Sequence, residues 1–548
     1  MNNSNTETNY SALTTLTTVF FFWGFIAAGN SIFIPFCKNF FSLDQFLAQL
    51  IDFAFYLAYF LGALGLFAAG SSSGKDIVGS WGYKKSIIYG LLFSAMGAGA
   101  MIVSVYLNTF VGMLMGLFTV ALGFSLQQTS TNPFMIALGD PKTGSNRINL
   151  GGAVNSLGTT LGPLIIAFAL FGSAEAVSDD MISSLPLSKV IILYAGVGLL
   201  FLAIAFILNR NKNVPSGISS EVPEKANKAL YTLLTMTLLL GICFAPVFNS
   251  YRGLDECNIA TNAVEMNRML WLAGGLAVVV ACILFARFSS SSTKESSEGW
   301  GAMKYPQLTM GMLAIFLYVG VEVAIGSNLG ELLKQKAFGG YEASEIAPFV
   351  AMFWGSLMIG RWVGSVNVFP ISDKKKMILK FIVPFVAFAV VMGATYLADY
   401  EIDVLKWYFI CIIIQIVAFL ITRDKPALTL SVFSSLGLLA VIISLNTTGV
   451  VSVYALLSCG LACSIMWPCI FSLATAGLGK YTSQGAGFLV MMILGGAIIP
   501  PIQGKLADLE SVGIQNSFII CGLCFAYLIY YAWRARRSLL AQNIDFDA

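Results

Sequence analysis

Apolar residues dominate this chain in runs of about 20, each long enough for one helix across the hydrocarbon core of a bilayer. The runs recur from residue 13 almost to the C-terminus, and short polar segments separate them. Their lengths predict about sixteen membrane-spanning helices. We expect these helices at residues 13–36, 46–71, 84–106, 109–138, 148–172, 188–208, 229–248, 269–287, 307–333, 346–369, 376–398, 404–421, 427–444, 450–477, 483–504 and 514–534.

Composition supports a polytopic, all-α membrane protein. The 548 residues are 57% hydrophobic and 11% charged, against about 25% charged in an ordinary soluble domain. The net charge of +3 is small and dispersed, so a nucleic-acid partner is not expected. The chain has no His and no GxxxxGK[ST] motif, which removes the commonest metal ligand and a phosphate loop. We therefore expect no resident cofactor, no metal site and no catalytic residues; the expected partners are a small molecule and the lipid bilayer.

Basic residues mark one side of the predicted membrane protein. Lys and Arg gather in alternate loops, as GYKK at 82–85, NRNK at 209–212, DKKK at 373–376 and RARR at 534–537. The positive-inside rule then places both termini in the cytoplasm and the protein in an inner (plasma) membrane. The first ten residues lack the basic flank and cleavage site of a signal peptide, so the first helix is expected to be retained.

The two halves of the chain echo one another in the same order. FFFWGFIAAGNSIFIP at 20–35 is similar to IFLYVGVEVAIGSNL at 315–329, GFSLQQTSTNPFMIALG at 123–139 to GLACSIMWPCIFSLATAGLG at 460–479, and NSLGTTLGP at 155–163 to MMILGGAIIPP at 491–501. Such repeats, with Gly or Pro interrupting corresponding helices, are typical of secondary transporters. We predict a six-helix bundle at 1–208, a central linker with two inserted helices at 209–306, and a second bundle at 307–548 with extra helices around 404–444.

Polar side chains inside the predicted helices point to a binding surface. Gln128 and Asn132 lie four residues apart and so share one helix face, just before Pro133, and Asn155 adds an amide on the next helix. An unpaired polar group in hydrocarbon is costly, so these side chains must face partners, a cavity or water. For any one of them, hydrogen bonding between helices is an equally simple explanation.

The uncharged character of this surface suits a neutral, hydroxyl-rich ligand. Amides can bond its hydroxyl groups, and aromatic rings can cover its C–H faces. The predicted helices supply such rings at Trp23, Tyr56, Tyr59, Tyr318, Trp354 and Trp467. A sugar is therefore the expected ligand, although packing or interfacial anchoring explains any single ring as well.

Three charged residues fall within predicted helices: Asp52, Glu322 and Arg361. Charges inside a membrane usually pair or line an aqueous path. Glu322 and Arg361 lie on consecutive helices and could form one pair. Asp52 has no obvious cation and shares a helix face with Tyr56 and Tyr59, so Asp52 and Glu322 are the candidate sites for a coupling proton or Na⁺. The alternative for Asp52 is a position near the helix end, already in contact with bulk water.

Several longer motifs resemble a known family. TNPF at 131–134, RINLGGAVNSLGTTLGP at 147–163, YVGVEVAIGS at 318–327, GRWVG at 360–364 and YTSQGAGFLVMMILGGAIIPPIQGKLAD at 481–508 are similar to the fucose and glucose/galactose permease family of the major facilitator superfamily. The resemblance implies a major facilitator fold, with two six-helix bundles that rock about a central sugar site, plus about four extra membrane helices here. It also implies import coupled to protons or sodium, and places Trp23, Asn155, Arg361 and Trp467 at the sugar site.

The chain departs from this family at the acids expected to carry protons. Where the family usually has Asn-Asp in its first helix, this chain has Asn30 followed by Ser31, and Gln128 stands where the fucose branch has a glutamate. Gly152 replaces a glutamine of the fifth helix, whereas Asp52 stands where relatives usually carry glutamine. Our hypothesis is that Asp52 has taken over the function of the missing acids.

The function expected from the sequence is import of a neutral hexose, similar to glucose or galactose, by alternating access with proton or sodium symport. The expected substrate-binding residues are Trp23, Asn30, Gln128, Asn132, Asn155, Tyr318, Arg361 and Trp467. Two alternatives stay open: an uncoupled sugar uniporter, which the missing acids would suit, and a membrane sugar sensor that does not transport. An integral-membrane enzyme has little support, because no nucleophile or metal cluster accompanies the two acids.

Overall fold

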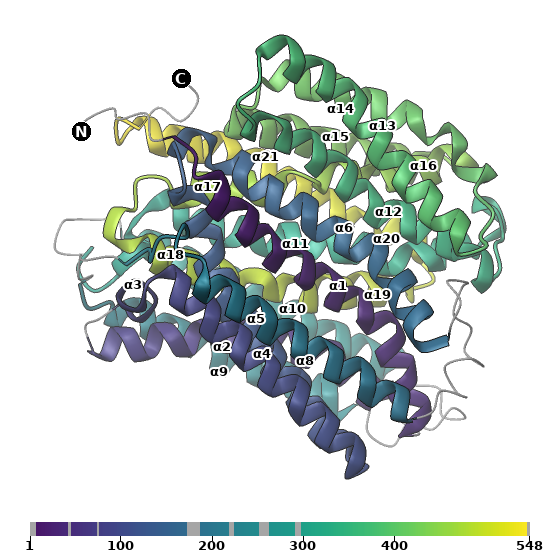
Figure 1. Cartoon of the computed structure of the whole chain (residues 1–548). Coiled ribbons are helices and arrows are strands. Elements are labelled where there is room, and N and C mark those ends of the chain that lie inside the picture. Colours follow the sequence, from purple (N-terminus) through teal and green to yellow (C-terminus); the bar gives the residue numbers. More distant parts are fainter. Residues whose placement is uncertain are drawn as a thin grey trace.

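The computed structural model describes residues 7–41, 45–73, 76–171, 187–218, 224–250, 262–290 and 297–544, and within these ranges the secondary structure is helical, without strands. Fourteen helical stretches are long and apolar enough to cross a membrane. The helices α1 and α6, of 31 and 28 residues, bring the number to the predicted sixteen. Figure 1 shows the start of α1 (Tyr10–Phe40) and the end of α21 (Ile519–Leu540) at the same end of the molecule, which we call the terminal end.

The first half contributes six long helices: α1 (Tyr10–Phe40), α2 (Gln45–Ser73), α4 (Tyr83–Tyr106), α5 (Phe110–Ala137), α6 (Gly144–Phe171) and α8 (Leu187–Arg210). The short helix α3 (Ile77–Trp81) and the turn η1 (Pro141–Thr143) connect them at the terminal end. The pairs α1/α6, α2/α5 and α4/α8 pack against each other, and α4 also packs along α5. These six helices form the first bundle.

The second half contains α11 (Pro306–Leu333), α12 (Ala343–Ser365), α13 (Asp373–Leu397), α14 (Phe409–Thr422), α15 (Pro426–Asn446), α16 (Gly449–Cys463), α17 (Met466–Thr475), α18 (Thr482–Met491), α19 (Gly495–Ala507), α20 (Gly513–Ser517) and α21 (Ile519–Leu540). Its packing repeats that of the first half, because α11 packs on α19 as α1 packs on α6, and α15 packs on α21 as α4 packs on α8. The helices α13 and α14 lie outside this repeat and pack beside α12, α15 and α16.

Three segments predicted as single helices are interrupted, and in the one predicted at 514–534 Phe518 separates α20 from α21. The segment predicted at 450–477 is divided into α16 and α17 at Ser464 and Ile465, and the segment predicted at 483–504 is divided by a 3-10 turn, η7 (Met492–Leu494). The break in the segment at 450–477 has a direct cause: Pro468 has no N–H to donate to the carbonyl of Ser464, four residues earlier. Hydropathy could not reveal it, because both sides of the break are apolar.

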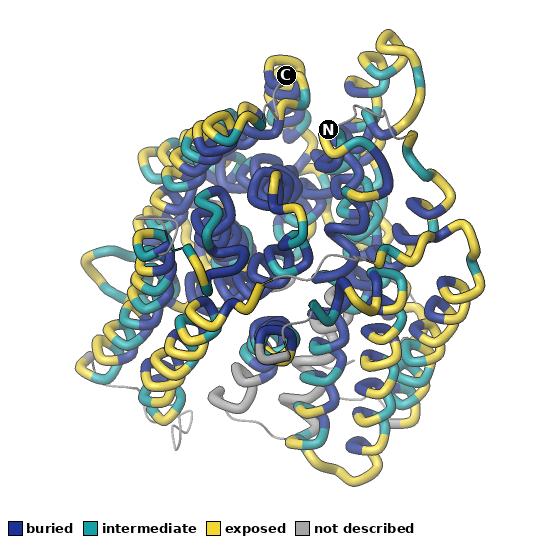
Figure 2. The backbone as a smooth tube through the Cα atoms, turned by 90° about the vertical axis from the view of Figure 1, so that its left-hand side faces the viewer, coloured by how far each residue is buried: buried dark blue, intermediate teal, exposed yellow. Residues whose placement is uncertain are grey.

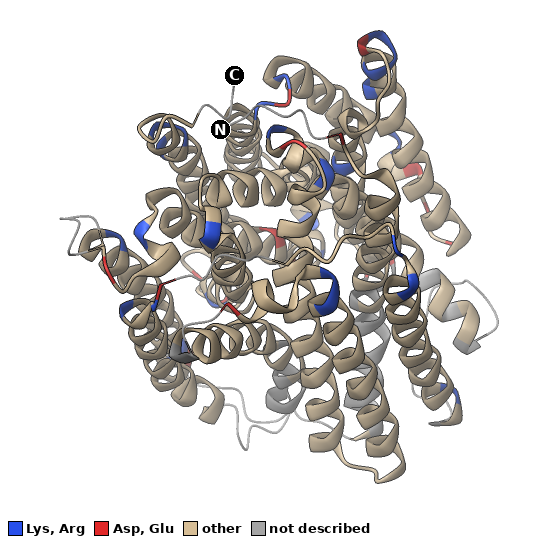
Figure 3. Ribbon diagram, turned by 60° about the vertical axis from the view of Figure 1, so that its left-hand side comes forward, with Lys and Arg blue, Asp and Glu red and all other residues tan. Residues whose placement is uncertain are grey.

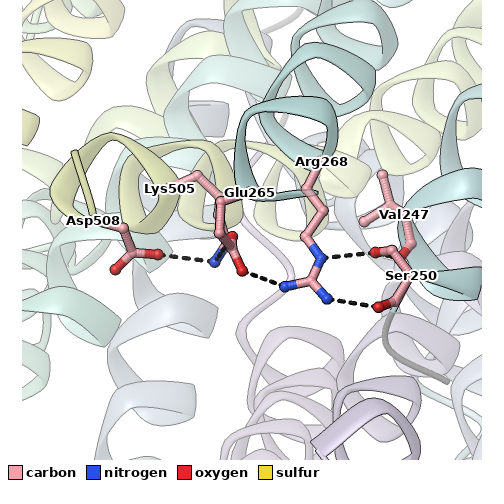
Figure 4. Close-up of polar contacts among 6 residues, drawn as sticks. All are labelled: Val247, Ser250, Glu265, Arg268, Lys505 and Asp508. Atoms are coloured by element: carbon pink, nitrogen blue, oxygen red, sulfur yellow. Dashed lines mark hydrogen bonds and ion pairs between the residues drawn. The ribbon is translucent and has the colours of Figure 1, made fainter. Parts of the chain in front are cut away.

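The helix pair α9 (Asn227–Asn249) and α10 (Asn262–Ser289) lies between the two halves in the chain, and α10 packs against α11 and α19 of the second half. Arg268 of α10 donates to the side chain and carbonyl of Ser250, both at 2.7 Å, and pairs with Glu265. Glu265 also pairs with Lys505 of α19 at 2.5 Å, and Lys505 with Asp508 at 2.8 Å (Figure 4). The pair α9/α10 is therefore fixed to the second bundle by charge.

The surface has the character that lipid requires. Figure 2 shows buried positions in the middle of the molecule and exposed positions on its outside, and large apolar side chains such as Phe206, Ile413 and Leu439 are among those exposed. Figure 3 shows long stretches of helix without a charged residue. An outer face of this kind is stable in hydrocarbon rather than in water, so the protein is a multi-pass membrane protein.

Candidate functional site

The consecutive polar side chains of α5, at residues 127–132, differ in their burial. Gln127 is fully buried; its Oε1 accepts the indole N–H of Trp23 at 2.8 Å and its Nε2 donates to Ser94 at 3.1 Å. The neighbouring Gln128 is half-buried and donates to the hydroxyl of Tyr59 at 3.1 Å. The polar group of Trp23 is thus committed to Gln127 within the first bundle, whereas Gln128 retains exposed surface.

Beyond Gln128, α5 carries buried polar atoms that no described residue satisfies. Asn132 donates to the carbonyl of Gln128 at 3.0 Å, but its Oδ1 accepts no hydrogen bond from the described residues. The same holds for the buried hydroxyl groups of Thr129 and Thr131. A buried polar atom without a partner costs about 1–3 kcal/mol. This end of α5 is therefore suited to water or to a polar ligand.

The fifth long helix of the first bundle, α6, supplies an amide and a hydroxyl. Asn155 is half-buried and donates to the carbonyl of Phe20 on α1 at 3.0 Å, which leaves its Oδ1 available to a ligand donor. The next residue, Ser156, accepts a hydrogen bond from Arg361 of the second bundle at 2.8 Å. This contact joins the two bundles directly.

Arg361 of α12 is the centre of the charged part of the site. Its Nη2 lies 3.6 Å from Glu322 Oε1 and 3.4 Å from the hydroxyl of Tyr318, both on α11. Its Nε donates to the carbonyl of Ser464 at 3.2 Å. The predicted Glu322–Arg361 pair is therefore confirmed, and 13% of each side chain remains accessible. A partly accessible ion pair between helices can exchange partners without becoming wholly desolvated.

Pro468 and Gly152 shape the surroundings of Arg361. The carbonyl of Ser464 is free to accept from Arg361 because of the break caused by Pro468. On the other side, a Cβ at Gly152 would lie 3.2 Å from Cδ of Arg361, so the arginine occupies space that a larger residue there would contest. The signals were present in the sequence as a proline four residues after a serine, and as glycine in place of the family's glutamine.

Aromatic rings adjoin the ion pair. The rings of Tyr318 and Trp467 lie 6.4 Å apart, and Trp467 is half-buried and stacks on Phe471 at 6.1 Å. Trp354 lies elsewhere, against Gly326 of α11. Tyr56 approaches Gly496 of α19. The structure therefore brings Tyr318, Glu322, Arg361 and Trp467 together from the second half, with Ser156 from the first.

Two predicted residues lie outside the part of the structure in which side chains are described. Asn30 is in α1 and Asp52 is in α2, and the backbone of both positions is helical. Their assignment to substrate binding and to cation coupling stays a prediction.

The predicted repeat has a structural counterpart at the helix crossings. A Cβ at Gly158 of α6 would lie 2.3 Å from the carbonyl oxygen of Phe21 in α1. A Cβ at Gly495 would lie 1.8 Å from the carbonyl oxygen of Phe316 in α11. These two pairs occupy the same places in the similar segments of the two halves. Glycine allows both backbone contacts, which bring the fifth helix of each half close to its first.

The two bundles also touch at the terminal end. Ser483 of α18 donates to Asp76 at 3.1 Å, and the hydroxyl of Tyr10 donates to the carbonyl of Val368 at 2.8 Å. Burial raises the pKa of Asp76, while hydrogen bonds from the backbone of Gly79 and from Ser483 oppose that change. A cavity of about 40 Å³ lies here, lined by residues of α2, α5 and α18. That volume suits one or two water molecules rather than a sugar.

Comparisons with known proteins extend over nearly the whole chain. No family model matches it. A glucose/galactose transporter of Brucella abortus (strain 9-941) is 30% identical over 536 residues, which cover 98% of this chain and 97% of that protein. An L-fucose-proton symporter of Escherichia coli (strain K12) is 26% identical, with 94% of this chain and 91% of that protein covered.

Solved structures show the same fold. A crystal structure of FucP, a major facilitator superfamily transporter, in the outward conformation has a TM-score of 0.61 and 21% identity, and covers 95% of this chain and 98% of the other. The human organic anion transporter MFSD10 has a TM-score of 0.53 and 13% identity. At these identities the likeness shows the arrangement of helices and nothing about the ligand.

Proposed function

The chain belongs to the glucose/galactose transporter family of the major facilitator superfamily, and from this premise we propose that it imports a neutral hexose by alternating access. The observation that carries the proposal is the contact of Arg361 with Glu322 and Tyr318 on one side and with Ser156 on the other. It lies where the two bundles meet, which is where a secondary transporter of this fold binds its substrate.

The proposed sugar site combines two kinds of donor and acceptor. Gln128, Asn132 and Asn155 of the first half offer amide groups, and Arg361 offers guanidinium N–H groups that suit pairs of adjacent hydroxyls. Trp467 and Tyr318 supply apolar faces for the sugar ring. Trp23 would contribute its ring face only, because its N–H is bonded to Gln127. Asn30 completes the proposed set.

Glu322 and Asp52 are the proposed sites for the coupling cation. A proton or Na⁺ at Glu322 would weaken the attraction between Glu322 and Arg361. The guanidinium could then turn its N–H groups to sugar hydroxyls, so that cation and sugar bind together. Binding of either one would favour binding of the other by the same factor, which is the thermodynamic basis of symport.

We place the protein in the inner membrane with both termini in the cytoplasm, as the distribution of Lys and Arg favours. The contacts of Asp76 with Ser483 and of Tyr10 with Val368 would then close the cytoplasmic side. In the proposed import cycle, these contacts break when the loaded carrier opens inward. We further propose that residues 1–208 and 307–548 are the moving halves, joined by the linker and helix pair of 209–306.

Uptake of radiolabelled glucose and galactose into proteoliposomes tests the proposal. With an imposed proton gradient, and separately with a sodium gradient, we expect accumulation above the external concentration with one of the two ions. Equilibration without accumulation would identify a uniporter. Saturable binding without flux would identify a sensor, and a chemically altered sugar would identify an enzyme. Absence of both binding and flux for every neutral hexose would refute the proposal.

A further inference from the structure

One helix that the two-bundle plan does not require reaches the charged part of the site. The sequence of α14 is FICIIIQIVAFLIT, in which Gln415 is the sole amide and most other positions are apolar. Much of this helix faces outward, with Ile413, Ile414 and Val417 about half exposed. Gln415, in contrast, is 2% exposed and lies against α12 and α16. A lone amide in such a helix must have a partner, because hydrocarbon offers none.

The partner of Gln415 is the break between α16 and α17. Its Nε2 donates to the carbonyl of Leu461 at 3.1 Å and to the hydroxyl oxygen of Ser464 at 3.3 Å. Ser464 in turn donates to Leu461 at 2.6 Å. Gly360 makes this arrangement possible, since a Cβ there would lie 1.9 Å from the Ser464 hydroxyl oxygen and 2.4 Å from Gln415 Nε2. Gln415 thus fixes Ser464, the first residue of the break.

The same break holds the functional residues of α12 and α17. The carbonyl of Ser464, released by Pro468, accepts from Nε of Arg361 at 3.2 Å. Three residues later, Trp467 presents its ring beside Tyr318. A continuous series of hydrogen bonds therefore runs from Gln415 through Ser464 to Arg361, and from Arg361 to Ser156 of the first bundle.

We propose that Gln415 is a positioning residue for sugar binding, which acts through Ser464 to set the orientation of Arg361 and Trp467. This inference rests on the proposed function of the Arg361 site. It gives α14 a role in function, because Gln415 of this helix holds Ser464 in position from outside the six-helix bundle. The rotamer of Arg361 depends on a fixed carbonyl at Ser464, and that carbonyl is fixed when the break is held from outside.

Tyr408 provides a matched control on the same side of the bundle. It immediately precedes α14, is fully buried, and its hydroxyl bonds to Ser356 of α12 at 2.8 Å and to the carbonyl of Leu457 in α16 at 2.9 Å. It therefore links α14 to α12 and α16, the two helices against which Gln415 lies, but its hydrogen-bond partners in the described structure include neither Ser464 nor Arg361. A purely structural role of α14 would make the two residues equivalent.

The test compares Gln415→Met with Tyr408→Phe in full-length protein in proteoliposomes. Both substitutions keep side-chain volume and remove buried hydrogen bonds, so both should lower the unfolding temperature. We expect Gln415→Met to raise KM for the transported hexose roughly tenfold, which corresponds to about 1.4 kcal/mol, with less change in kcat. Tyr408→Phe should leave KM within about twofold of the wild type, inside the scatter of an independent site.

A double-mutant cycle shows whether Gln415 acts through Ser464. Ser464→Ala should raise KM as Gln415→Met does, and the double variant should show no further rise, because the two side chains belong to one series of hydrogen bonds. Tyr408→Phe should add nothing to Ser464→Ala in KM. Equal KM values for Gln415→Met and Tyr408→Phe, or independent effects of Gln415→Met and Ser464→Ala, would overturn the inference.

Amide hydrogen exchange keeps this test separate from the transport proposal. Peptides that span residues 461–468 should exchange faster in Gln415→Met than in the wild type or Tyr408→Phe, with or without sugar. If wild-type protein transports no hexose but this difference is present, the proposed function fails and the positioning of the break stands. If exchange at 461–468 is unchanged by Gln415→Met, the positioning role is wrong whatever the uptake shows.

Discussion

The two halves of the molecule share a backbone plan but use different chemistry at the site. Gly158 against Phe21 and Gly495 against Phe316 show that the fifth helix crosses the first in the same way in both halves. The side chains of the two halves differ. The first half offers amides and hydroxyls from α5 and α6, whereas the second half offers an ion pair, Arg361 with Glu322, and aromatic rings.

A repeated fold can thus carry asymmetric side chains where its two halves meet. Trp23 and Tyr318 occupy corresponding places in the two halves. The indole N–H of Trp23 donates a hydrogen bond to the neutral Gln127, whereas the hydroxyl of Tyr318 accepts one from the charged Arg361. Proline lies at corresponding places in α5 and α17, Pro133 and Pro468. Glycine thus gives the two halves the same helix crossing, whereas proline acts differently in them, because α5 continues through Pro133 and the second-half segment is broken before Pro468.

The largest expected effect comes from breaking the charged half. Arg361→Met leaves Glu322 without its cation between helices, where loss of one member of a buried pair costs about 3–5 kcal/mol. We expect uptake to fall at least about 100-fold, since a lost charged contact to substrate is worth about 3 kcal/mol or more. The double variant Arg361→Met with Glu322→Gln should regain most of the stability but not the uptake. Normal uptake by Arg361→Met would contradict the assignment of Arg361 to the site.

The shared backbone plan is tested by adding one methyl group to each half. Gly158→Ala and Gly495→Ala would place a Cβ 2.3 Å and 1.8 Å from a backbone carbonyl oxygen, so the crossing helices must separate. We expect each to reduce the free energy of unfolding by about 1–3 kcal/mol, as overpacking does elsewhere. Gly65→Ala and Gly393→Ala are the controls, since a Cβ there meets nothing within 4 Å. Thermal unfolding in detergent measures all four; equal stability would refute the proposed crossings.

Two neighbouring glutamines separate structure from recognition within the neutral half. Gln127→Leu leaves the indole N–H of Trp23 unpaired in a buried place, and should cost about 1–3 kcal/mol of stability. Gln128 is only half-buried, so we expect Gln128→Leu, which removes the hydrogen bond to the hydroxyl of the buried Tyr59, to lose less stability but to raise KM roughly tenfold, about 1.4 kcal/mol. The measurements are KM for uptake and the unfolding temperature of each variant. If the two variants change both quantities equally, both glutamines serve packing.

The smallest effect concerns the contact between the halves at the terminal end. The pKa of Asp76 in the folded protein lies above its ordinary value of 3.8, mainly because of burial. The folded state therefore holds the proton more tightly, and the contribution of Asp76 to stability declines as pH rises from 3.8 through the folded-state pKa. Asp76→Asn should flatten that part of the stability profile and be slightly more stable at neutral pH. An unchanged slope in unfolding temperature against pH would show that Asp76 does not titrate there.

Sequence alone was sufficient for the features that depend on composition and order. The apolar runs predicted about sixteen membrane helices, and fourteen spans in the described structure are long and apolar enough to cross a bilayer, because the thickness of a bilayer fixes the length of an apolar helix. The similar segments of the halves predicted the repeat that Gly158 and Gly495 display. The pair of Glu322 and Arg361 followed from the cost of an isolated charge in hydrocarbon, since a charge must find its opposite on a nearby helix.

The neighbours of each polar side chain, in contrast, depend on how the helices pack in three dimensions. A membrane helix is apolar on its lipid face and on its packed face alike, so the sequence has little amphipathic pattern from which to assign a face. Nothing in the order of residues therefore separated Gln127 from Gln128, or gave Gln415 a partner 49 residues away. Those contacts arise where helices distant in sequence meet, and the break at Ser464 matters because Arg361 lies beside it.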